Sequence, residues 1–282
     1  MPSAFGRAAD RGSLAHYDDP AYYQKAYAAR RHDVDYYVKL ARRAGSPVLE
    51  YGVGNGRVAL PIARAGVSVV GVDVARPMLK SLAERLRGEP ARVRDRVRLV
   101  QGDMRRVRLK GRFRLVIAPF NTLLHLYSLP EIEAFLARVR EHLAPGGRFV
   151  FDVSLPQPHD LIKDPSRPYR APRLRHPTAG KLVGYAERFA YDPIRQLLLV
   201  EIEFSPEDGS DPWCVPLTHR QFFPQELAAL LHYNGFSDLQ FSADFSDRPP
   251  GSQVDSLVVS CRCSSKTPRR AVGRLATPRT RA

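Results

Sequence analysis

Short apolar runs rich in β-branched residues alternate with amphipathic segments along residues 46–153, and each run ends near an acid, a glycine or a proline. This alternation is typical of a doubly wound α/β protein, with a mostly parallel sheet and helices on both faces. It predicts a strand just before Gly52 and four more over residues 68–73, 97–104, 115–121 and 148–153. The intervening segments predict helices over residues 57–65, 77–87 and 130–143, the last followed by a turn at 144–147.

A different pattern follows residue 154. Residues 155–177 are rich in proline, arginine and histidine, which predicts mostly loop. Three alternating runs separated by turn residues then predict an antiparallel meander over residues 181–191, 195–204 and 213–223. A helix is expected from Pro224 to a glycine C-cap at Asn234-Gly235. A closing strand pair is expected over residues 236–245 and 253–262.

The N-terminal part reads as one helix. Asp19 followed by Pro20 is a good helix start, and the pattern predicts that the helix runs to about residue 43. Its tyrosines, including Tyr22 and Tyr27, gather along one side of the first turns. Two interpretations are compatible with this segment: an amphipathic helix packed on the core, or a helix that closes over a site.

The turn after the first strand has glycine at alternate positions, namely Gly52, Gly54 and Gly56, and is preceded by Glu50. Glycines let the backbone turn tightly and let a ligand lie against it. A dinucleotide-binding fingerprint requires glycine where this chain has Arg57, and a pyrophosphate is repelled by a carboxylate at position 50. The turn therefore favours a cofactor without phosphate and with a cationic amino-acid end, a description that fits S-adenosylmethionine.

Acids also end the next strands, at Asp73 and at Asp103 within Gly-Asp-Met. With these motifs in order, the chain resembles the class I, seven-stranded S-adenosylmethionine-dependent methyltransferases over roughly residues 46–154 and 225–262. The resemblance implies that Glu50 accepts from the cofactor's amino group and that the three glycines underlie the ligand. It also implies ribose contacts for Asp73 and adenine contacts for the following residues: Val74, Met78, Asp103 and Met104.

The loop after the fourth strand supplies a candidate base. Its sequence Phe120-Asn121-Thr-Leu-Leu-His125 resembles the corresponding loop of amino-sugar and glycine N-methyltransferases, and it places Phe120 and Asn121 beside the cofactor. His125, whose ordinary pKa lies near neutrality, could accept a proton from an amine or hydroxyl. The structural alternative is a histidine in the wall of the cleft. In the same relatives a tyrosine-bearing N-terminal segment lies over the cofactor, which extends the expected contacts to Tyr22 and Tyr27.

These observations divide the chain into five expected parts. They are an N-terminal helical lid (1–45), a cofactor-binding core (46–154), a substrate-pocket antiparallel insertion (155–224), a closing helix and strand pair (225–262) and a disordered basic tail (263–282). The expected function is methyl transfer from S-adenosylmethionine to a nitrogen or oxygen of a small-molecule acceptor.

Composition narrows the classes of protein further. The chain has 282 residues, is 44% hydrophobic and has no apolar run of 18 residues or more. Together with the absence of a signal-like N-terminus, this predicts a cytoplasmic protein without membrane contact. The three cysteines lack zinc-like spacing, so no metal site is expected.

Charge keeps two alternatives open. The net charge is +15, and the segment from Arg262 onward carries seven Lys or Arg and no acid, which leaves +8 on residues 1–261. A basic tail of this kind allows weak nucleic-acid contact, so an RNA or protein methyltransferase is the second enzymatic interpretation. A noncatalytic cofactor-binding scaffold is the alternative from another class.

Overall fold

A computed structural model describes residues 11–251 and 254–264 of the chain. Its larger sheet has seven strands in the order β10-β11-β5-β4-β1-β2-β3. Strands β1 to β5 are parallel, and β11 runs antiparallel between β5 and β10. The predicted doubly wound, seven-stranded sheet is confirmed. Its strands are β1 (Val48–Tyr51), β2 (Val69–Asp73), β3 (Val97–Gln101), β4 (Phe113–Ala118), β5 (Leu143–Ser154), β10 (Phe236–Ala243) and β11 (Ser256–Cys263).

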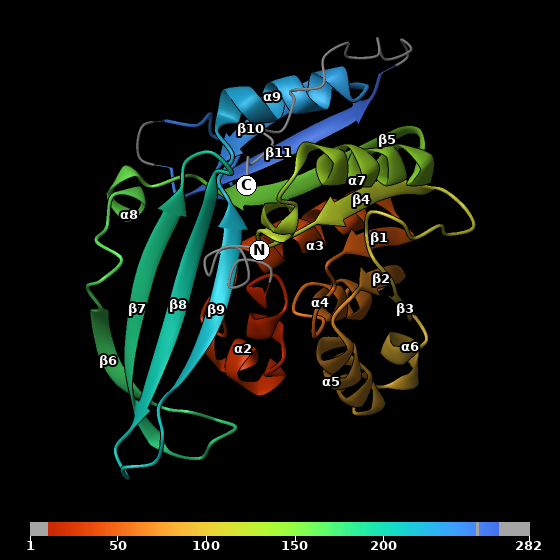
Figure 1. The fold of residues 1–282 in the computed structure, drawn as a ribbon. Coiled ribbons are helices and arrows are strands. Elements are labelled where there is room, and N and C mark those ends of the chain that lie inside the picture. The colour runs from red at the N-terminus through yellow and green to blue at the C-terminus, as the bar shows by residue number, and fades with distance from the viewer. Residues whose placement is uncertain (1–10, 252–253, 265–282) are drawn as a thin grey trace.

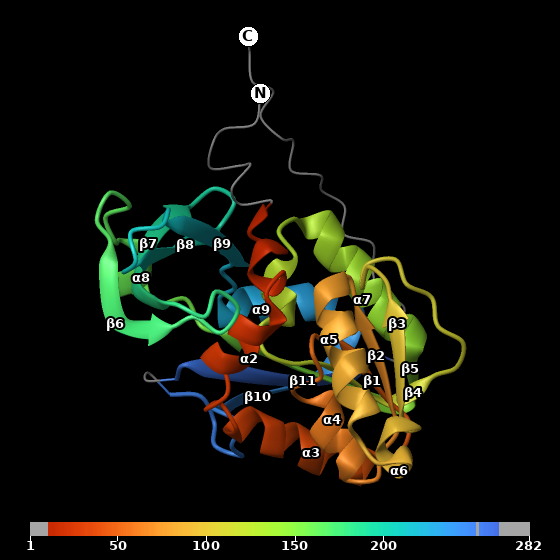
Figure 2. The ribbon, with the colours of Figure 1, turned by 90° about the horizontal axis from the view of Figure 1, so that it is seen from below.

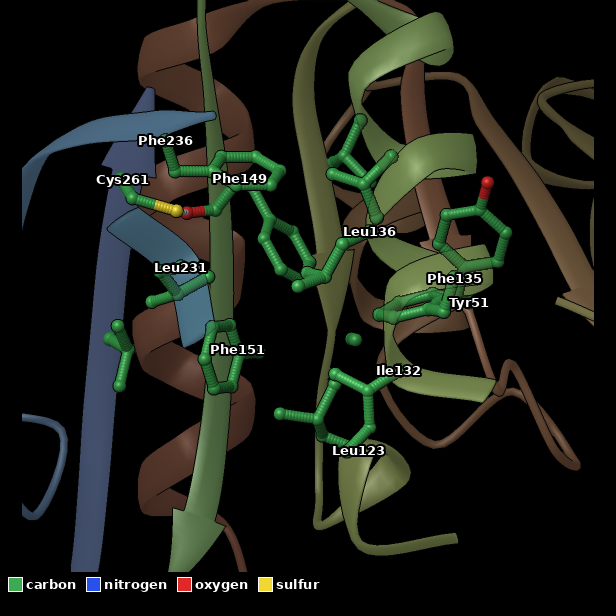
Figure 3. Packing of buried hydrophobic residues seen from close by; sticks show 14 of the residues in the cluster. Tyr51, Leu123, Ile132, Phe135, Leu136, Phe149, Phe151, Leu231, Phe236 and Cys261 are labelled. Atoms are coloured by element: carbon green, nitrogen blue, oxygen red, sulfur yellow. Dashed lines mark hydrogen bonds between the residues drawn. The ribbon is translucent and has the colours of Figure 1, made fainter. Parts of the chain in front are cut away.

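Helices cover both faces of this sheet (Figures 1 and 2). On one face, α7 and α9 pack against the sheet in a cluster that includes Phe135, Phe149 and Leu231 (Figure 3). On the other face, α3, α4 and α5 bury residues such as Tyr37 and Leu60. These helices are α3 (His32–Ala44), α4 (Ala59–Arg64), α5 (Arg76–Arg87), α6 (Ala91–Arg94), α7 (Leu129–His142) and α9 (Pro224–Tyr233).

A second, four-stranded antiparallel sheet stands beside the first, in the order β6-β7-β8-β9 (Figure 1). Its strands are β6 (Tyr169–Arg175), β7 (Leu182–Asp192), β8 (Leu197–Pro206) and β9 (Trp213–Arg220). The three-stranded meander was predicted, whereas β6 and the short helix α8 (Pro158–Leu161) lie where a loop was expected. The alternation of β6 is masked by its exposure, because most of its side chains face solvent.

The single N-terminal helix predicted from residue 20 to residue 43 is wrong. The chain forms a 3-10 turn, η1 (Ala15–Tyr17), then α2 (Pro20–Ala26) and, after a break at residues 27–31, α3. Tyr22 of α2 packs against the four-stranded sheet, whereas Tyr37 of α3 packs beneath the seven-stranded sheet. A straight helix cannot reach both places, so the break redirects the chain between two cores.

Two further expectations need comment. Residues 144–147 do not form a turn outside the sheet but lie within β5, where the pairing with β4 shifts register and Gly146 has a φ of +72°. Most of the basic tail expected over residues 263–282 lies outside the described residues. Among those that are described, no helix combines the length and apolar character needed to cross a membrane.

Candidate cofactor and acceptor site

A cleft of about 320 Å³ opens at the carboxyl ends of β1, β2, β3 and β4. This is where open α/β sheets bind their ligands, because loops diverge there and helices begin. The N-terminal segment borders the same cleft, since Leu14, Tyr17 and Tyr23 contribute to its lining. The predicted site residues that also line it are Glu50, Gly52, Gly54, Asp73, Val74, Met78, Asp103, Met104, Phe120 and His125.

The glycines of the turn serve two different purposes. Gly54 lines the cleft with a φ of +53°, and a Cβ there would lie 3.3 Å from Met78 Cε. Gly52 has a φ of +67°, and a Cβ would meet Thr122 Oγ1 at 2.4 Å. Gly56 is absent from the lining, and a Cβ there would meet Leu82 Cδ1 at 2.3 Å. Gly56 therefore allows α4 and α5 to approach, and the structure does not place it against a ligand as predicted.

Glu50 is the clearest sign of a ligand. Its side chain is 2% exposed, and Oε2 makes no hydrogen bond to any described residue. Burial, with a further contribution from Asp73, raises the pKa of Glu50 well above its usual value. An unpaired buried carboxyl is costly, and a cationic donor in the cleft would relieve that cost. The residue therefore fits the amino group of an amino-acid ligand.

Asp73 is held by the turn that it faces. Its carboxylate accepts hydrogen bonds from the backbone N–H of Gly54 at 2.7 Å and of Ala75 at 2.8 Å. Burial raises its pKa despite these bonds. Beside it, Met78 is buried and Val74 is 50% exposed, so an apolar wall stands next to an acceptor. This combination suits a ribose beside a base.

Asp103 lines the same cleft and already has a cationic partner. Its Oδ2 pairs with Arg105 Nη2 at 2.8 Å. Partial burial opposes ionisation, but the hydrogen bonds and charge of Arg105 outweigh it and lower the pKa of Asp103. Arg105 also pairs with Glu131, which lines the cleft as well. The carboxylate is thus fixed and ionised at the cleft, next to Met104.

The turn after β4 is strained and firmly held. Phe120 and Asn121 adopt left-handed backbone conformations, with φ of 56° and 63°, which are uncommon for residues other than glycine and cluster at functional sites. Phe120 N–H donates to Asp152 Oδ1 at 2.8 Å. Asn121 exchanges hydrogen bonds with Ser154, so its side chain braces the end of β5. Asn121 is absent from the lining of the cleft, contrary to the prediction, whereas Phe120 lines it.

His125 lies in a 3-10 turn, η2 (Thr122–His125), that follows this loop. Its Nε2 shares a hydrogen bond of 2.6 Å with the Tyr17 hydroxyl, and its Nδ1 is buried without a partner among the described residues. Burial, and then the nearby His16, lower the pKa of His125 to about 4. The imidazole is therefore neutral over the ordinary pH range, because burial moves its pKa well below the near-neutral value of an unburied histidine.

The structure does not place Tyr22 or Tyr27 along the cleft. Tyr22 faces the four-stranded sheet and stacks on His176 with ring centroids 5.1 Å apart. The ring of Tyr27 packs against that of Phe120, with centroids 4.8 Å apart, and its hydroxyl shares a hydrogen bond with His16 Nε2. The tyrosines of the N-terminal segment that line the cleft are instead Tyr17 of η1 and Tyr23 of α2. Tyr22 and Tyr23 differ because consecutive residues on a helix point to different faces.

Sequence reasoning missed two further polar groups. Asn55, between the second and third glycines, is 2% exposed, lines the cleft and has no partner for Nδ2 among the described residues. Arg57 is paired with Asp33 of α3, with Nη1 2.9 Å from Oδ1. Its guanidinium also lies 4.4 Å from the centre of the Phe120 ring. A buried polar residue inside a glycine turn is a signal that could have identified Asn55.

Known proteins share this arrangement. Residues 48–147 match the methyltransferase-domain family. The solved structure of the CcbJ methyltransferase from Streptomyces caelestis superposes with a TM-score of 0.72 and 28% identity, over 84% of this chain and 98% of that one. Residues 48–147 thus match a methyltransferase domain, and the seven-stranded fold around them is that of the class I methyltransferases.

Two curated methyltransferases are similar in sequence. The cypemycin N-terminal methyltransferase of a Streptomyces species is 34% identical over 112 residues, which are 40% of this chain and 43% of that protein. The dTDP-3-amino-3,4,6-trideoxy-alpha-D-glucopyranose N,N-dimethyltransferase of Streptomyces venezuelae is 29% identical over 128 residues, 45% of this chain and 51% of that protein. The chain spans about half the length of the curated relatives that it matches.

Proposed function

We propose that the chain transfers a methyl group from S-adenosylmethionine to an amine nitrogen, or to an oxygen, of a small-molecule acceptor. The observation that carries this proposal is one cleft lined by two functional groups of residues: a buried, unpaired Glu50 carboxyl at the glycine turn, and a hydrogen-bonded pair between Tyr17 of the N-terminal segment and His125. We call the part around Glu50 the cofactor end and the part around Tyr17 and His125 the acceptor end. The match to a methyltransferase domain supports S-adenosylmethionine as the donor.

The cofactor end of the cleft matches an amino acid linked to a nucleoside. Glu50 would accept from the ammonium group, and the unpaired Nδ2 of Asn55 would donate to the carboxylate. Asp73 would accept from the ribose hydroxyls, next to the apolar surface of Met78. Asp103 would accept from the adenine amino group. When bound, the sulfonium of S-adenosylmethionine supplies an activated methyl group for in-line displacement.

The acceptor end is built to hold a proton-bearing atom. Tyr17 and His125 present a neutral phenol and a neutral imidazole to the cleft. Both groups can accept a hydrogen bond from an amine N–H and so aim the nitrogen lone pair, and the neutral imidazole can take up the proton that the nitrogen loses. The names of both curated relatives specify an amino nitrogen, which favours nitrogen over oxygen here.

The remainder of the pocket would exclude water. Tyr23, Phe120 and Leu126 line the cleft with apolar surface between its two ends. Methyl transfer needs little besides alignment and a dry site, because the nucleophile and the leaving group need only be held in line. We propose that the four-stranded sheet and the N-terminal segment together select the acceptor.

Calorimetry and mass spectrometry test the proposal. The protein should bind S-adenosylhomocysteine and not NADH. Incubation with S-adenosylmethionine and a library of amines and amino sugars should yield products heavier by about 14 Da, the mass of one added CH₂ group. Glu50→Gln, which keeps the shape but not the charge, should weaken binding about 10-fold or more, since a charged hydrogen bond is worth about 1.5–3 kcal/mol. Tight NADH binding without S-adenosylhomocysteine binding would overturn the proposal.

A further inference from the structure

Residues 76–114 concentrate the positive charge of the folded chain. This segment contains 14 Lys or Arg and four Asp or Glu, a surplus of ten. The whole of residues 1–261 has a surplus of only eight, so the remainder of that region is slightly acidic. The segment comprises α5, α6, β3, the connection after it and the start of β4. We call this surface the basic edge.

The basic edge surrounds one border of the molecule. Strand β3 is the last strand of the seven-stranded sheet and pairs only with β2. Helix α5 contacts both β3 and α6 on one face of the sheet, and residues 102–112 run along the other side (Figure 2). Cations therefore flank the open strand from both faces.

Many of these cations have no acidic partner. Arg105 and Arg108 are paired with acids, but eight of the 14 cationic side chains of the basic edge are exposed and make no ion pair with any residue in 11–251 or 254–264. These residues are Arg76, Lys80, Arg87, Arg92, Arg98, Lys110, Arg112 and Arg114. Charges that repel one another are retained here without compensation, which lowers the stability of the folded state.

Protection of an open strand edge explains only part of this charge. Charged side chains on an edge strand prevent pairing with other chains, and Arg98 of β3 can do so. Arg76, Lys80 and Arg87 lie on α5, however, and Lys110 lies in the connection after β3. These side chains do not lie on the unpaired edge of a strand, so protection of an edge does not account for them. A basic surface of this extent suits the binding of a polyanion.

The side chains also indicate which polyanion. Arginine outnumbers lysine twelve to two within the basic edge, and the planar guanidinium matches phosphate in a bidentate manner. Single-stranded nucleic acids are held by stacking bases on exposed aromatic rings. Phe113 is the single aromatic residue among residues 76–114, and it is buried. We propose that the basic edge is a docking surface for the phosphate backbone of duplex nucleic acid, without sequence specificity.

This proposal is independent of the methyl-transfer proposal. The basic edge meets the cleft through Arg76's neighbours on α5 and through Asp103, Met104 and Arg105, at the end assigned to the nucleoside. Tyr17 and His125 come from η1 and η2, which lie outside the basic edge. Duplex binding would therefore localise the protein and would not present an acceptor base to the cleft.

The test compares two double charge reversals in the full-length chain. Arg92→Glu with Arg98→Glu alters the basic edge, and Arg170→Glu with Arg195→Glu makes the same charge change on the four-stranded sheet and its β7–β8 turn. All four side chains are exposed and without ion pairs to described residues. Fluorescence anisotropy with a labelled duplex DNA of about 20 base pairs, at several salt concentrations, measures affinity and salt slope. Binding of S-adenosylhomocysteine and circular dichroism check the fold.

The wild-type protein should bind the duplex with a steep salt dependence. The edge variant should lose about 10-fold or more in affinity, and its log–log salt slope should become shallower by about two, whereas the control should change about twofold at most. Should the edge variant fail to fold, Arg92→Gln with Arg98→Gln repeats the test with half the charge change. Equal losses in both variants, tighter binding of single-stranded DNA, or tighter binding of poly-L-glutamate than of the duplex would overturn the proposal.

Discussion

The two ends of the cleft contrast in how they are built. The cofactor end comes from one continuous stretch, in which Glu50, Asp73 and Asp103 each lie at or just after the carboxyl end of a parallel strand and the sheet brings them together. The acceptor end is assembled from distant segments: Tyr17 of η1 meets His125 of η2, and His219 of β9 lies with its ring centre 5.1 Å from that of His125.

The difference follows from what fixes each side chain. Parallel strands of regular geometry impose the spacing between successive strand ends, so order in the sequence becomes position in space. No such rule links η1 to η2, whose separation of 108 residues is bridged only by packing. The cofactor end is therefore predictable by position, whereas the acceptor end depends on the insertion and the N-terminal segment.

The largest expected effect belongs to the acceptor end. His125→Ala should leave cofactor affinity unchanged and lower turnover by about 10²–10⁴-fold, the range for loss of a general base. Because burial lowers the pKa of His125 to about 4, protonation should reduce the wild-type rate only as the pH falls toward 4. Between pH 6 and 9, this residue should contribute no pH dependence. Steady-state rates with an identified acceptor measure both effects.

His159→Ala provides a matched control, because that histidine is exposed and distant from the cleft. At high pH, where an amine loses its proton without help, the His125→Ala enzyme should recover part of its rate. Near-normal turnover of this variant at every pH would make His125 a wall residue and leave alignment alone to carry the reaction.

A smaller effect is expected at the cofactor end. Asp73→Ala should weaken S-adenosylhomocysteine binding by about 1.5–3 kcal/mol, since a buried acceptor for the ribose is lost. The same carboxylate also accepts a hydrogen bond from Gly54 N–H at 2.7 Å. Asp73→Asn keeps one acceptor oxygen, so its affinity for S-adenosylhomocysteine should lie between those of the wild type and Asp73→Ala. Calorimetry on folded protein measures the affinities. Unchanged binding in Asp73→Ala would remove this residue from the cofactor site.

Asp152, which accepts a hydrogen bond from the backbone N–H of Phe120, should affect the stability of the protein rather than cofactor binding. Burial raises the pKa of Asp152 to about 6, against hydrogen bonds from Tyr37 and Phe120 that favour ionisation. Since the ordinary pKa is 3.8, the folded state binds more protons than the unfolded state between about pH 4 and 6, and stability falls as pH rises through that range. Asp152→Asn should therefore be more stable than wild type by about 1–2 kcal/mol at pH 7.5.

That advantage should shrink as the pH falls and vanish below about pH 3, where the wild-type carboxyl is protonated in both states. Urea denaturation at pH 7.5 and at about pH 3 measures it, with Asp95→Asn, an exposed acid, as the control. A gain that is equal at both pH values would show that ionisation of Asp152 is not its cause.

The smallest effect is expected from the C-terminal segment. Truncation after Cys263 removes no residue of the cleft, so cofactor affinity and small-molecule turnover should stay unchanged, and stability should shift by no more than about 0.5 kcal/mol. Paired assays of the full-length and truncated proteins test this. Loss of turnover would place part of the site beyond residue 263 and weaken the contrast between the two ends.

Much of the fold and the cofactor end followed from the sequence by itself. The alternation of apolar runs and amphipathic segments determined the parallel sheet, because the periodicity of hydrophobic positions and the content of β-branched residues indicate which segments are buried strands and which are helices. Glycines and acids at the strand ends determined which side chains meet at the cofactor end. Even there, only the structure separated Gly54 on the cleft from Gly56 between α4 and α5, since both have a positive φ and differ in what a Cβ would meet.

Tertiary structure alone decided the acceptor end. Periodicity placed Tyr22, Tyr23 and Tyr27 near one another, but the break after α2 and the presence of the four-stranded sheet determined that Tyr23 faces the cleft while Tyr22 faces away. The pairing of Tyr17 with His125 and the low pKa of that imidazole likewise depend on burial between segments far apart in the chain. Sequence pattern records local periodicity, whereas orientation and desolvation arise only when separate segments pack together.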